Sequence, residues 1–287
     1  EIRPGENVGL VGESGCGKST LSRLLSWIEE PDQGRIVFQG KDMASLRGKD
    51  RLAMRRRFQL LLQDPYNCLP PHLSVARTIR TSLDIHGVKG AEAKERVRAV
   101  MHEVGLKDED AERLPIGMSA GQRQRVNIAR ALVLEPTLLI LDETLSSLDP
   151  AEQSRLIDLF ERLQAKHGLT YLVISHDLAL VRKVCNRVAV MYLGKIVENA
   201  GNAMIFDRPG NPYTRALLSA VPVLDKGPFN PAECLVEGEP PSPINVPKGC
   251  SFASRCPKAQ DLCRTDEPAF SPTRDSQGGV ACHFPFT

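Results

Sequence analysis

A glycine-rich loop near the start of the chain constrains the fold more than any other feature. Residues 12–20, GESGCGKST, fit the phosphate-binding loop pattern G-x-x-x-x-G-K-[ST]. Residues 7–11 have the apolar character of a short buried strand, and residues 18–30 carry leucine and isoleucine at helical spacing. The motif requires a strand before the loop and a helix after it, so we expect a phosphate-binding site at this junction.

The residue types of the loop suit a nucleoside triphosphate. Backbone N–H groups of a glycine-rich turn and the positive end of the following helix form an anion site, which glycines let the phosphates approach closely. We expect Lys18 to contact the β and γ phosphates and Ser19 to place its hydroxyl on Mg²⁺. The residues expected to contact the nucleotide are Gly12, Ser14, Gly15, Cys16, Gly17, Lys18, Ser19 and Thr20.

The composition excludes several classes of protein. With 287 residues, 41% of them hydrophobic, the chain can build a real core in one large or two modest domains. There are 37 basic and 35 acidic residues, and the formal charge of +2 is no footprint for nucleic acid or an acidic membrane surface. No apolar segment has the roughly 20 residues that cross a bilayer, and the first residues do not resemble a signal peptide. We therefore expect a soluble cytoplasmic protein, held at a membrane only through another subunit.

Apolar runs of strand length alternate with helical patterns along most of the chain. Beyond the loop, strands are predicted at residues 35–38, 58–62, 137–141, 170–174 and 187–191. Helices are predicted at residues 44–57, 75–106, 119–134, 151–166 and up to 184, with Ser119 as an N-cap. This alternation predicts an α/β fold with a doubly wound, mainly parallel sheet and a helical subdomain at about residues 68–134.

Polar side chains stand where three of these strands end. Gln63, the pair Asp142 and Glu143, and His176 each follow an apolar run. Ligands of open α/β sheets bind at the carboxyl ends of the strands, so these positions are candidates for a site. Taken singly, the two acids can be a helix cap and its exposed neighbour, while His176 and Ser119 can belong to an ordinary turn and helix cap.

Together these positions form an ordered set that resembles the ATP-binding subunits of ABC transporters. In that family they match the Q-loop, the signature motif, the Walker B strand, the D-loop and the switch histidine. The matching residues are Gln63, Ser119-Ala120-Gly121-Gln122, Asp142-Glu143, Ser147-Leu148-Asp149 and His176. The resemblance implies an ABC-type nucleotide-binding domain of the P-loop NTPase class over residues 1–206, with its N-terminal strands missing.

The resemblance also implies ATP hydrolysis, and each implied role has a physical reason. Phosphoryl transfer to water needs positioning and charge neutralisation, with ATP and Mg²⁺ as cofactors. As a hard cation, Mg²⁺ takes oxygen ligands, here from Ser19, Gln63 and Asp142. Glu143 is expected to polarise the attacking water as a general base, and His176 and Gln63 to sense the γ phosphate.

The signature residues Ser119, Gly121 and Gln122 are expected to act in trans. In the family this segment faces phosphates bound by a second subunit, and the helix N-terminus supplies N–H groups. We therefore expect function to require a homodimer or heterodimer, and an isolated monomer to hydrolyse ATP poorly.

The chain departs from the family pattern at three places. Ala120 replaces the second glycine of the signature, which costs about 1 kcal/mol if that position needs a positive φ. Residues 144–147 are TLSS where the family usually has Pro-Thr-Ser-Ala. The aromatic residue that stacks on adenine in the family lies before Glu1. Because the chain also starts without methionine, we expect upstream sequence that was removed or belongs to a larger polypeptide, such as a fused second cassette.

The composition changes near Asp207. Residues 207–287 are rich in proline and glycine, have little predicted secondary structure beyond a helix at 211–218, and hold five of the eight cysteines. We expect a separate appendage. The segments NPYTRALL at 211–218 and CSFASRCP at 250–257, with Cys263 and the Cys-His pair at 282–283, resemble the C-terminal extension of oligopeptide, dipeptide and nickel importer ATPases.

Four cysteines of this extension are candidate metal ligands: Cys250, Cys256, Cys263 and Cys282. In some members of the family four such cysteines hold a [4Fe–4S] cluster. From the residues alone, converging thiolates suit an iron–sulfur cluster or zinc, reduced structural cysteines are an alternative, and disulfides are unusual in a reducing compartment. The spacing is not the paired C-x-x-C of common zinc sites, and only the resemblance favours iron–sulfur. Cys16, Cys68 and Cys185 are expected to be packing residues.

The sequence thus predicts the ATPase subunit of an ABC importer for peptides or a related small ligand such as a nickel chelate. The implied partners are a second ABC ATPase domain, two transmembrane permeases and an extracytoplasmic substrate-binding protein, without nucleic acid. The implied location is the cytoplasmic face of the membrane, as a peripheral subunit. Two alternatives are a non-transport ABC ATPase, which usually has a long coiled-coil insertion or a second cassette, and the regulatory half of an asymmetric pair. The transported substrate is not encoded in this chain.

Overall fold

The computed structural model describes residues 1–62, 64, 68–145, 148–220, 238, 241–242, 246–272 and 278–286, so the predicted sites at Gln63 and Ser147 lie outside it. The described chain forms two compact units. The first unit is Glu1–Gly5 with Leu21–Leu172, and the second is Glu6–Thr20 with Val173–Thr287. The division between them crosses helix α1 (Lys18–Leu25) and strand β6 (Thr170–Ile174).

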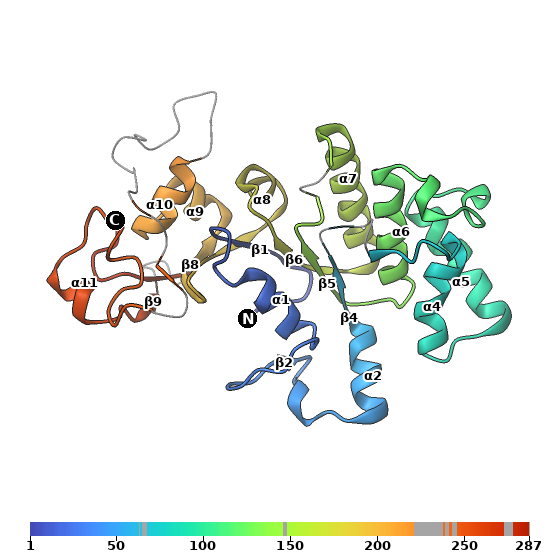
Figure 1. Cartoon of the computed structure of the whole chain (residues 1–287), viewed down its shortest axis with the longest axis horizontal. Helices are drawn as coiled ribbons and strands as arrows, with labels where there is room; N and C mark the ends of the chain where they lie inside the picture. The colour runs from blue at the N-terminus through green and yellow to red at the C-terminus, as the bar shows by residue number, and fades with distance from the viewer. Residues whose placement is uncertain are drawn as a thin grey trace. The chain divides into compact units, whose positions relative to one another are not determined.

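The sheet of the second unit changes from parallel to antiparallel pairing. Strand β1 (Asn7–Val11) pairs in parallel with β7 (Arg187–Tyr192). Beyond β7 the strand order is β8, β10 and β9, and each of these pairings is antiparallel (Figure 1). The bounds of these strands are Lys195–Gly201, Gly279–Ala281 and Phe270–Pro272. The C-terminal extension therefore supplies the last two strands of this sheet.

Strand β1 is buried and closely covered by helix α8 (Leu178–Val184). Leu10 and Val11 are 2% and 1% exposed. Gly9 permits the close approach of the helix, because a Cβ at this position would lie 2.6 Å from Cγ1 of Val181. A short strand buried in this way delivers the chain directly into the predicted phosphate loop. The other helices of the second unit are α9 (Asn202–Asp207), α10 (Pro212–Ser219) and α11 (Asp261–Thr265).

The first unit contains a second set of parallel strands. Strand β4 (Phe58–Leu61) pairs in parallel with β5 (Leu138–Asp142), and β6 follows β5 in the strand order. The apolar run predicted at 137–141 is confirmed as a strand whose last four residues are buried. The other described elements of the first unit, outside its helices at residues 75–132, are β2 (Val37–Phe38), β3 (Lys41–Asp42), η1 (Met43–Ser45), α2 (Gly48–Arg57) and α7 (Pro150–His167).

Three helices of the first unit pack on one another in the part of the chain where a helical subdomain is expected (Figure 1). They are α4 (Val75–Ile85), α5 (Gly90–Glu103) and α6 (Ala120–Leu132), with the short turns η2 (Asp108–Asp110) and η3 (Pro115–Gly117) between α5 and α6. The helical pattern expected over 75–106 is interrupted at Gly87, whose φ of +78° turns the chain between α4 and α5.

Helix α1 is shorter than the pattern at 18–30 predicts. It ends at Leu25, and Trp27 has a φ of +56°, which takes the chain out of the helical course. The indole then packs with Met43, Met54 and Phe58 in a small core, while Ile28 is 60% exposed. An apolar residue therefore follows the end of the helix because Trp27 packs in this small core.

The strands after residue 194 were not predicted. Strand β8 has a charged side chain in its middle, but Glu198 is only 3% exposed and accepts hydrogen bonds from the backbone N–H groups of Gly210 and Asn211. Strands are predicted from runs of apolar residues, so a strand with a buried acid at its centre gives no such local signal. The expected parallel sheet is correct for β1 with β7 and for β4 with β5, whereas the strands that follow are antiparallel.

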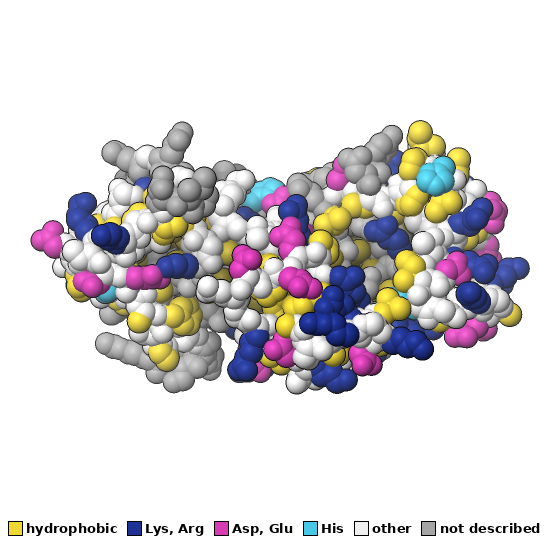
Figure 2. Space-filling model, turned by 60° about the horizontal axis from the view of Figure 1, so that its bottom comes forward, with side chains coloured by type: hydrophobic (Ala, Val, Ile, Leu, Met, Phe, Trp, Pro, Cys, Tyr) yellow, Lys and Arg dark blue, Asp and Glu magenta, His cyan; other side chains and the backbone are white. Residues whose placement is uncertain are grey.

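Both acidic and basic side chains lie on the face that Figure 2 displays, with a group of basic ones near its middle. The formal charge of the whole chain is +2. In the part of the chain that the structure describes, no helix combines the length and apolar character needed to span a bilayer.

Candidate functional site

The loop at residues 12–20 follows β1 directly and leads into α1. Gly12 packs against the backbone of β7, since an added Cβ would lie 2.2 Å from the carbonyl oxygen of Met191. Gly15 has a φ of +78°, a conformation that glycine adopts without strain. Ser14, Gly15 and Ser19 are exposed. The loop thus has the tight course of a phosphate-binding turn at a helix N-terminus, with exposed backbone and hydroxyl groups.

Lys18 is folded over the loop that it terminates. Its ammonium donates hydrogen bonds to the carbonyl oxygens of Gly12 at 2.8 Å and Glu13 at 2.9 Å, and the residue is only 7% exposed. A buried ammonium needs such partners. From this position beside the loop backbone, the ammonium can give up its hydrogen bonds to carbonyl oxygens and donate to phosphate oxygens instead.

Two further contacts hold the loop from the rest of the second unit. The phenolic oxygen of Tyr213 accepts a hydrogen bond from the backbone N–H of Glu13 at 2.8 Å. The backbone N–H of Gly194, in the turn after β7, donates to the carbonyl oxygen of Cys16 at 2.8 Å. The loop conformation therefore depends on side chains and turns far away in the sequence.

In the first unit, Asp142 ends strand β5. It is 7% exposed, and one of its oxygens accepts a hydrogen bond from the hydroxyl of Ser22 in α1 at 2.8 Å. The next residue, Glu143, has a φ of +48°, which is uncommon for a residue with a side chain. Strained backbone of this kind costs about 1–3 kcal/mol and is concentrated at functional sites. The pair predicted from the sequence thus lies at a distorted strand end.

His176 lies in the second unit, in the turn between β6 and α8, and its side chain is exposed. Ser175 before it is buried and accepts a hydrogen bond from the N–H of Asp177, which in turn caps α8 by accepting from Leu180 N–H at 3.0 Å. The turn is therefore built by its neighbours, and the histidine is presented at the end of a buried strand.

The signature segment begins α6 in the first unit. Ser119 is the N-cap, as predicted, and forms a capping box with Gln122: the hydroxyl accepts from Gln122 N–H, and the amide oxygen of Gln122 accepts from Ser119 N–H. Ala120 is the first helical residue and does not have a positive φ. The steric cost considered for this alanine is therefore absent. An added Cβ at Gly121 would lie 2.5 Å from a carboxylate oxygen of Glu152, so the flexible end of that side chain would have to shift.

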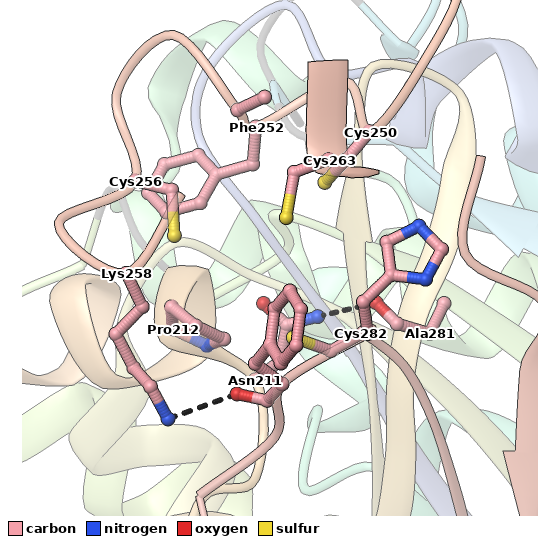
Figure 3. Close-up of a pocket in the computed structure, with 12 residues that line it drawn as sticks. Asn211, Pro212, Cys250, Phe252, Cys256, Lys258, Cys263, Ala281 and Cys282 are labelled. Atoms are coloured by element: carbon pink, nitrogen blue, oxygen red, sulfur yellow. Dashed lines mark hydrogen bonds between the residues drawn. The ribbon is translucent and has the colours of Figure 1, made fainter. Parts of the chain in front are cut away.

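Four cysteines of the C-terminal extension line one pocket, with Phe252 and Lys258 among its other walls (Figure 3). They are Cys250, Cys256, Cys263 and Cys282. Burial raises the pKa of the Cys282 thiol to about 11 and also raises the pKa of Cys250 and of Cys256. Since metals bind thiolates, a metal at this pocket would have to displace protons. Within the described residues, no group of three or more His, Cys, Asp or Glu side chains is arranged to hold a metal ion.

The other described cysteines are not among the residues that line this pocket. Cys185 is 6% exposed, and burial raises its pKa to about 12. Cys16 is buried in the phosphate loop beside Lys18, and Cys68 is half-buried. All three are free thiols, in keeping with the packing role expected of them.

Two residues that contact the predicted site residues were not predicted from the sequence. Ser22 follows Lys18 by four residues, which places both on one face of a helix, so its position carried a usable signal. Tyr213 is 200 residues from Glu13, and no local pattern connects them. Gln63 lies outside the described residues, and the assignment of Ser119, Gly121 and Gln122 to a second subunit's nucleotide stays a prediction.

Two family models match the chain. The model described as ABC transporter matches residues 1–146, and the one described as oligopeptide/dipeptide transporter, C-terminal region, matches residues 197–263. The match to a transporter C-terminal region is in keeping with the resemblance drawn from the Tyr213 and cysteine segments.

Known proteins match nearly the whole chain. It is 44% identical over 283 residues to a probable peptide ABC transporter ATP-binding protein of Sinorhizobium fredii, covering 98% of this chain and 80% of that protein. It is also 44% identical over 285 residues to the oligopeptide transport ATP-binding protein AppF of Bacillus subtilis, covering 98% of this chain and 86% of that protein.

Solved structures show the same fold. The structure of cbiO1 from Clostridium perfringens, part of the ABC transporter complex cbiONQ, matches with a TM-score of 0.65 and 31% identity, over 72% of this chain and 82% of that one. A dimeric post-hydrolysis state of an ATP-binding cassette bound to ADP and Pi matches with a TM-score of 0.62 and 25% identity, over 70% of this chain and 88% of that one. Because the ABC transporter model matches half of the chain and relatives that are 44% identical match nearly all of it, the chain belongs to the ATP-binding proteins of ABC transporters.

Proposed function

We propose that this chain is the ATP-hydrolysing subunit that powers an ABC importer for peptides or a related small ligand such as a nickel chelate. The observation that carries the proposal is the phosphate loop with Lys18 held over its carbonyl oxygens. The names of the relatives support peptides as the substrate class, since they are described as peptide and oligopeptide transport ATP-binding proteins. Permeases and a binding protein then set which peptide is carried.

ATP binding is assigned to the loop. Backbone N–H groups and hydroxyls of residues 12–20 bind the phosphates, and Lys18 transfers its hydrogen bonds from loop carbonyls to the β and γ phosphates. The nucleotide-contacting set is Gly12, Ser14, Gly15, Cys16, Gly17, Lys18, Ser19 and Thr20. Mg²⁺, when bound, supplies charge neutralisation at the phosphates, and Ser19, Gln63 and Asp142 are its assigned oxygen ligands.

Hydrolysis is assigned to Glu143. Its carboxylate accepts a proton from the attacking water, a contribution typically worth about 10² to 10⁴-fold. The φ of +48° at Glu143 supports this role, because a strained backbone fixes the direction of the side chain. His176 and Gln63 are assigned to orient the water and to hold the γ phosphate.

The proposed active unit is a dimer of ATP-binding domains, either identical or different. Ser119, Gly121 and Gln122 contact the γ phosphate of the nucleotide held by the opposite domain, through the N-terminus of α6. The dimer is assigned to the cytoplasmic face of the membrane, bound to two transmembrane permeases that receive substrate from an extracytoplasmic binding protein. The dimeric cassette among the solved structures supports this arrangement.

Substitution of Glu143 by Gln tests the catalytic assignment. In the assembled transporter we expect turnover to fall at least about 100-fold while ATP binding is retained. Glu161→Gln, on an exposed position of α7, is the matched control and should keep wild-type turnover. Unchanged turnover in the Glu143 variant would instead identify the regulatory half of an asymmetric pair.

We also propose that Cys250, Cys256, Cys263 and Cys282 hold a [4Fe–4S] cluster. The donor set supports it, because four thiols line one pocket and such clusters take four cysteine ligands. Zinc bound by the same thiolates is the competing assignment, and the sequence lacks the paired C-x-x-C spacing of common zinc sites. Only the resemblance to the importer ATPases favours iron–sulfur over zinc.

Iron and acid-labile sulfide in anaerobically purified protein test this assignment. We expect about four of each per chain in the wild type and in the Cys185→Ser control, and their loss in Cys282→Ser. Stoichiometric zinc without iron contradicts the cluster.

A further inference from the structure

An arginine of the cysteine-bearing extension forms an ion pair with the phosphate loop. Arg255 donates two parallel hydrogen bonds to the carboxylate of Glu13, from Nη1 to Oε2 at 2.9 Å and from Nη2 to Oε1 at 3.1 Å. Both residues belong to the second unit, although 242 positions separate them in the sequence. Glu13 lies inside the loop, directly after Gly12.

This ion pair is partly withdrawn from water. The side chain of Arg255 is 10% exposed and that of Glu13 is 31% exposed. An arginine guanidinium stays protonated in proteins, so Arg255 carries a full positive charge. A two-pronged arginine–carboxylate pair with this little exposure is stronger and geometrically more specific than an ordinary surface ion pair.

Arg255 lies next to residues that line the cysteine pocket. Arg255 directly precedes Cys256 and follows Phe252 by three residues, and both of these line the pocket. The ring of Phe252 packs edge-on against Tyr192 and Tyr213, whose centroids lie 5.4 Å away, and the Tyr213 hydroxyl accepts from the N–H of Glu13. Arg255 also donates a hydrogen bond from Nη1 to the Tyr192 hydroxyl at 3.4 Å, so the same aromatic group contacts both the arginine and the loop backbone.

The charges give this contact a consequence for ATP. Glu13 places a negative charge in a loop that binds phosphates, and an uncompensated carboxylate repels them. Arg255 neutralises that charge and holds the carboxylate on the side of the extension. Lys18, which donates to the backbone carbonyl of Glu13, is left to act on the phosphates.

We propose that Arg255 is a positioning residue through which the cysteine-bearing extension sets the affinity of the phosphate loop for ATP. The mechanism is charge neutralisation of Glu13. The inference rests on the proposed ATPase function and adds to it a coupling between the cysteine pocket and the nucleotide site. A change in the pocket that moves Arg255 would then change the affinity of the phosphate loop for ATP.

Binding of MgATP to the full chain tests the proposal. Arg255→Gln removes the charge and keeps most of the stem, and we expect the Kd for MgATP to rise about 3- to 10-fold. Glu13→Gln in the same chain should regain most of that affinity, because the repelling charge is gone. The loss in the single variant should also shrink at high salt, where the repulsion is screened.

A matched control separates this effect from a general loosening of the second unit. Arg182→Gln breaks an exposed ion pair with Asp207 and should leave the Kd within about twofold. If Arg255→Gln does not fold, Arg255→Lys decides the case: it keeps the charge and gives up the two-pronged geometry. Because the proposed effect is charge neutralisation, this variant should bind MgATP within about threefold of the wild type, and a larger loss overturns the proposal.

Two other results overturn it. One is an Arg255→Gln variant that binds MgATP like the wild type. The other is a loss of affinity that Glu13→Gln does not relieve, which would mean that Arg255 only supports the fold. If the wild-type chain itself does not bind MgATP, the proposed function fails together with the inference.

Discussion

The hydroxyl of Ser22 donates a hydrogen bond to Oδ2 of Asp142 across 2.8 Å, and both residues are buried. Ser22 lies one turn of α1 beyond Lys18, while Asp142 ends β5. A fixed hydroxyl directs one carboxylate oxygen and leaves the other to face elsewhere. A residue outside the recognised motifs therefore orients the acid that is assigned to Mg²⁺.

Substitution of Ser22 by Ala should weaken both stability and the use of Mg²⁺. The buried carboxylate loses this hydrogen bond, so we expect the free energy of unfolding to fall by about 1–3 kcal/mol. The Mg²⁺ concentration for half-maximal ATPase activity should rise, because Asp142 is no longer held in one orientation. Urea unfolding and a Mg²⁺ titration measure the two effects. Ser45→Ala, which removes an exposed hydroxyl, is the control, and an unchanged Mg²⁺ requirement in Ser22→Ala would contradict the role.

Restoration of glycine at position 120 should not improve the protein. Ala120 is the first residue of α6 and has no positive φ, so Ala120→Gly is expected to lower the free energy of unfolding by up to about 1 kcal/mol through the greater freedom of the unfolded chain. Turnover should be unchanged or lower. Thermal unfolding and steady-state ATPase assays check this, and a gain in turnover would show that the signature needs glycine for another reason.

Removal of the Tyr213 hydroxyl should weaken MgATP binding in addition to lowering the free energy of unfolding. In Tyr213→Phe the N–H of Glu13 loses its acceptor, and we expect a loss of about 1 kcal/mol in stability together with weaker MgATP binding. Tyr171→Phe is a matched control, since its buried hydroxyl donates to the carbonyl oxygen of Phe160 at the same distance of 2.8 Å. The control should lose similar stability and keep its ATP affinity. Equal ATP affinities in the two variants would argue against a role for Tyr213 in the loop.

Glu198 should make stability depend on pH. Burial raises its pKa in the folded chain above the usual value, so the folded chain binds this proton more tightly than the unfolded chain does. The resulting stabilisation is full below the unfolded pKa and is lost as the pH rises through the raised value. We expect Glu198→Gln to lose less stability than the wild type between pH 4.5 and neutral pH in urea unfolding. The exposed Glu267→Gln should keep the wild-type slope, and an identical slope in Glu198→Gln would refute this account.

Several elements were predictable because their signals are local. The apolar run at 170–174 became β6 with the same bounds, and Ser119 became the N-cap of α6, since strand burial and helix capping depend on adjacent residues. The end of α1 was not predictable. Trp27 continues the apolar spacing of the helix, but its partners Met43 and Met54 come from later segments. Strand β8 was missed because its central Glu198 is buried and accepts hydrogen bonds from the backbone of Gly210 and Asn211, contacts that no spacing rule includes.

By itself the sequence determined the phosphate loop, the order of the strand-end residues and the membership of the chain in its family, because each depends on residue types at short, regular spacing. Only the tertiary structure decided that Glu13 meets Tyr213 and Arg255, 200 and 242 positions away. It also decided that the C-terminal extension completes a sheet instead of forming the separate appendage expected from its composition. Such contacts depend on how distant surfaces pack and on which buried charges find partners, and neither is written in local periodicity.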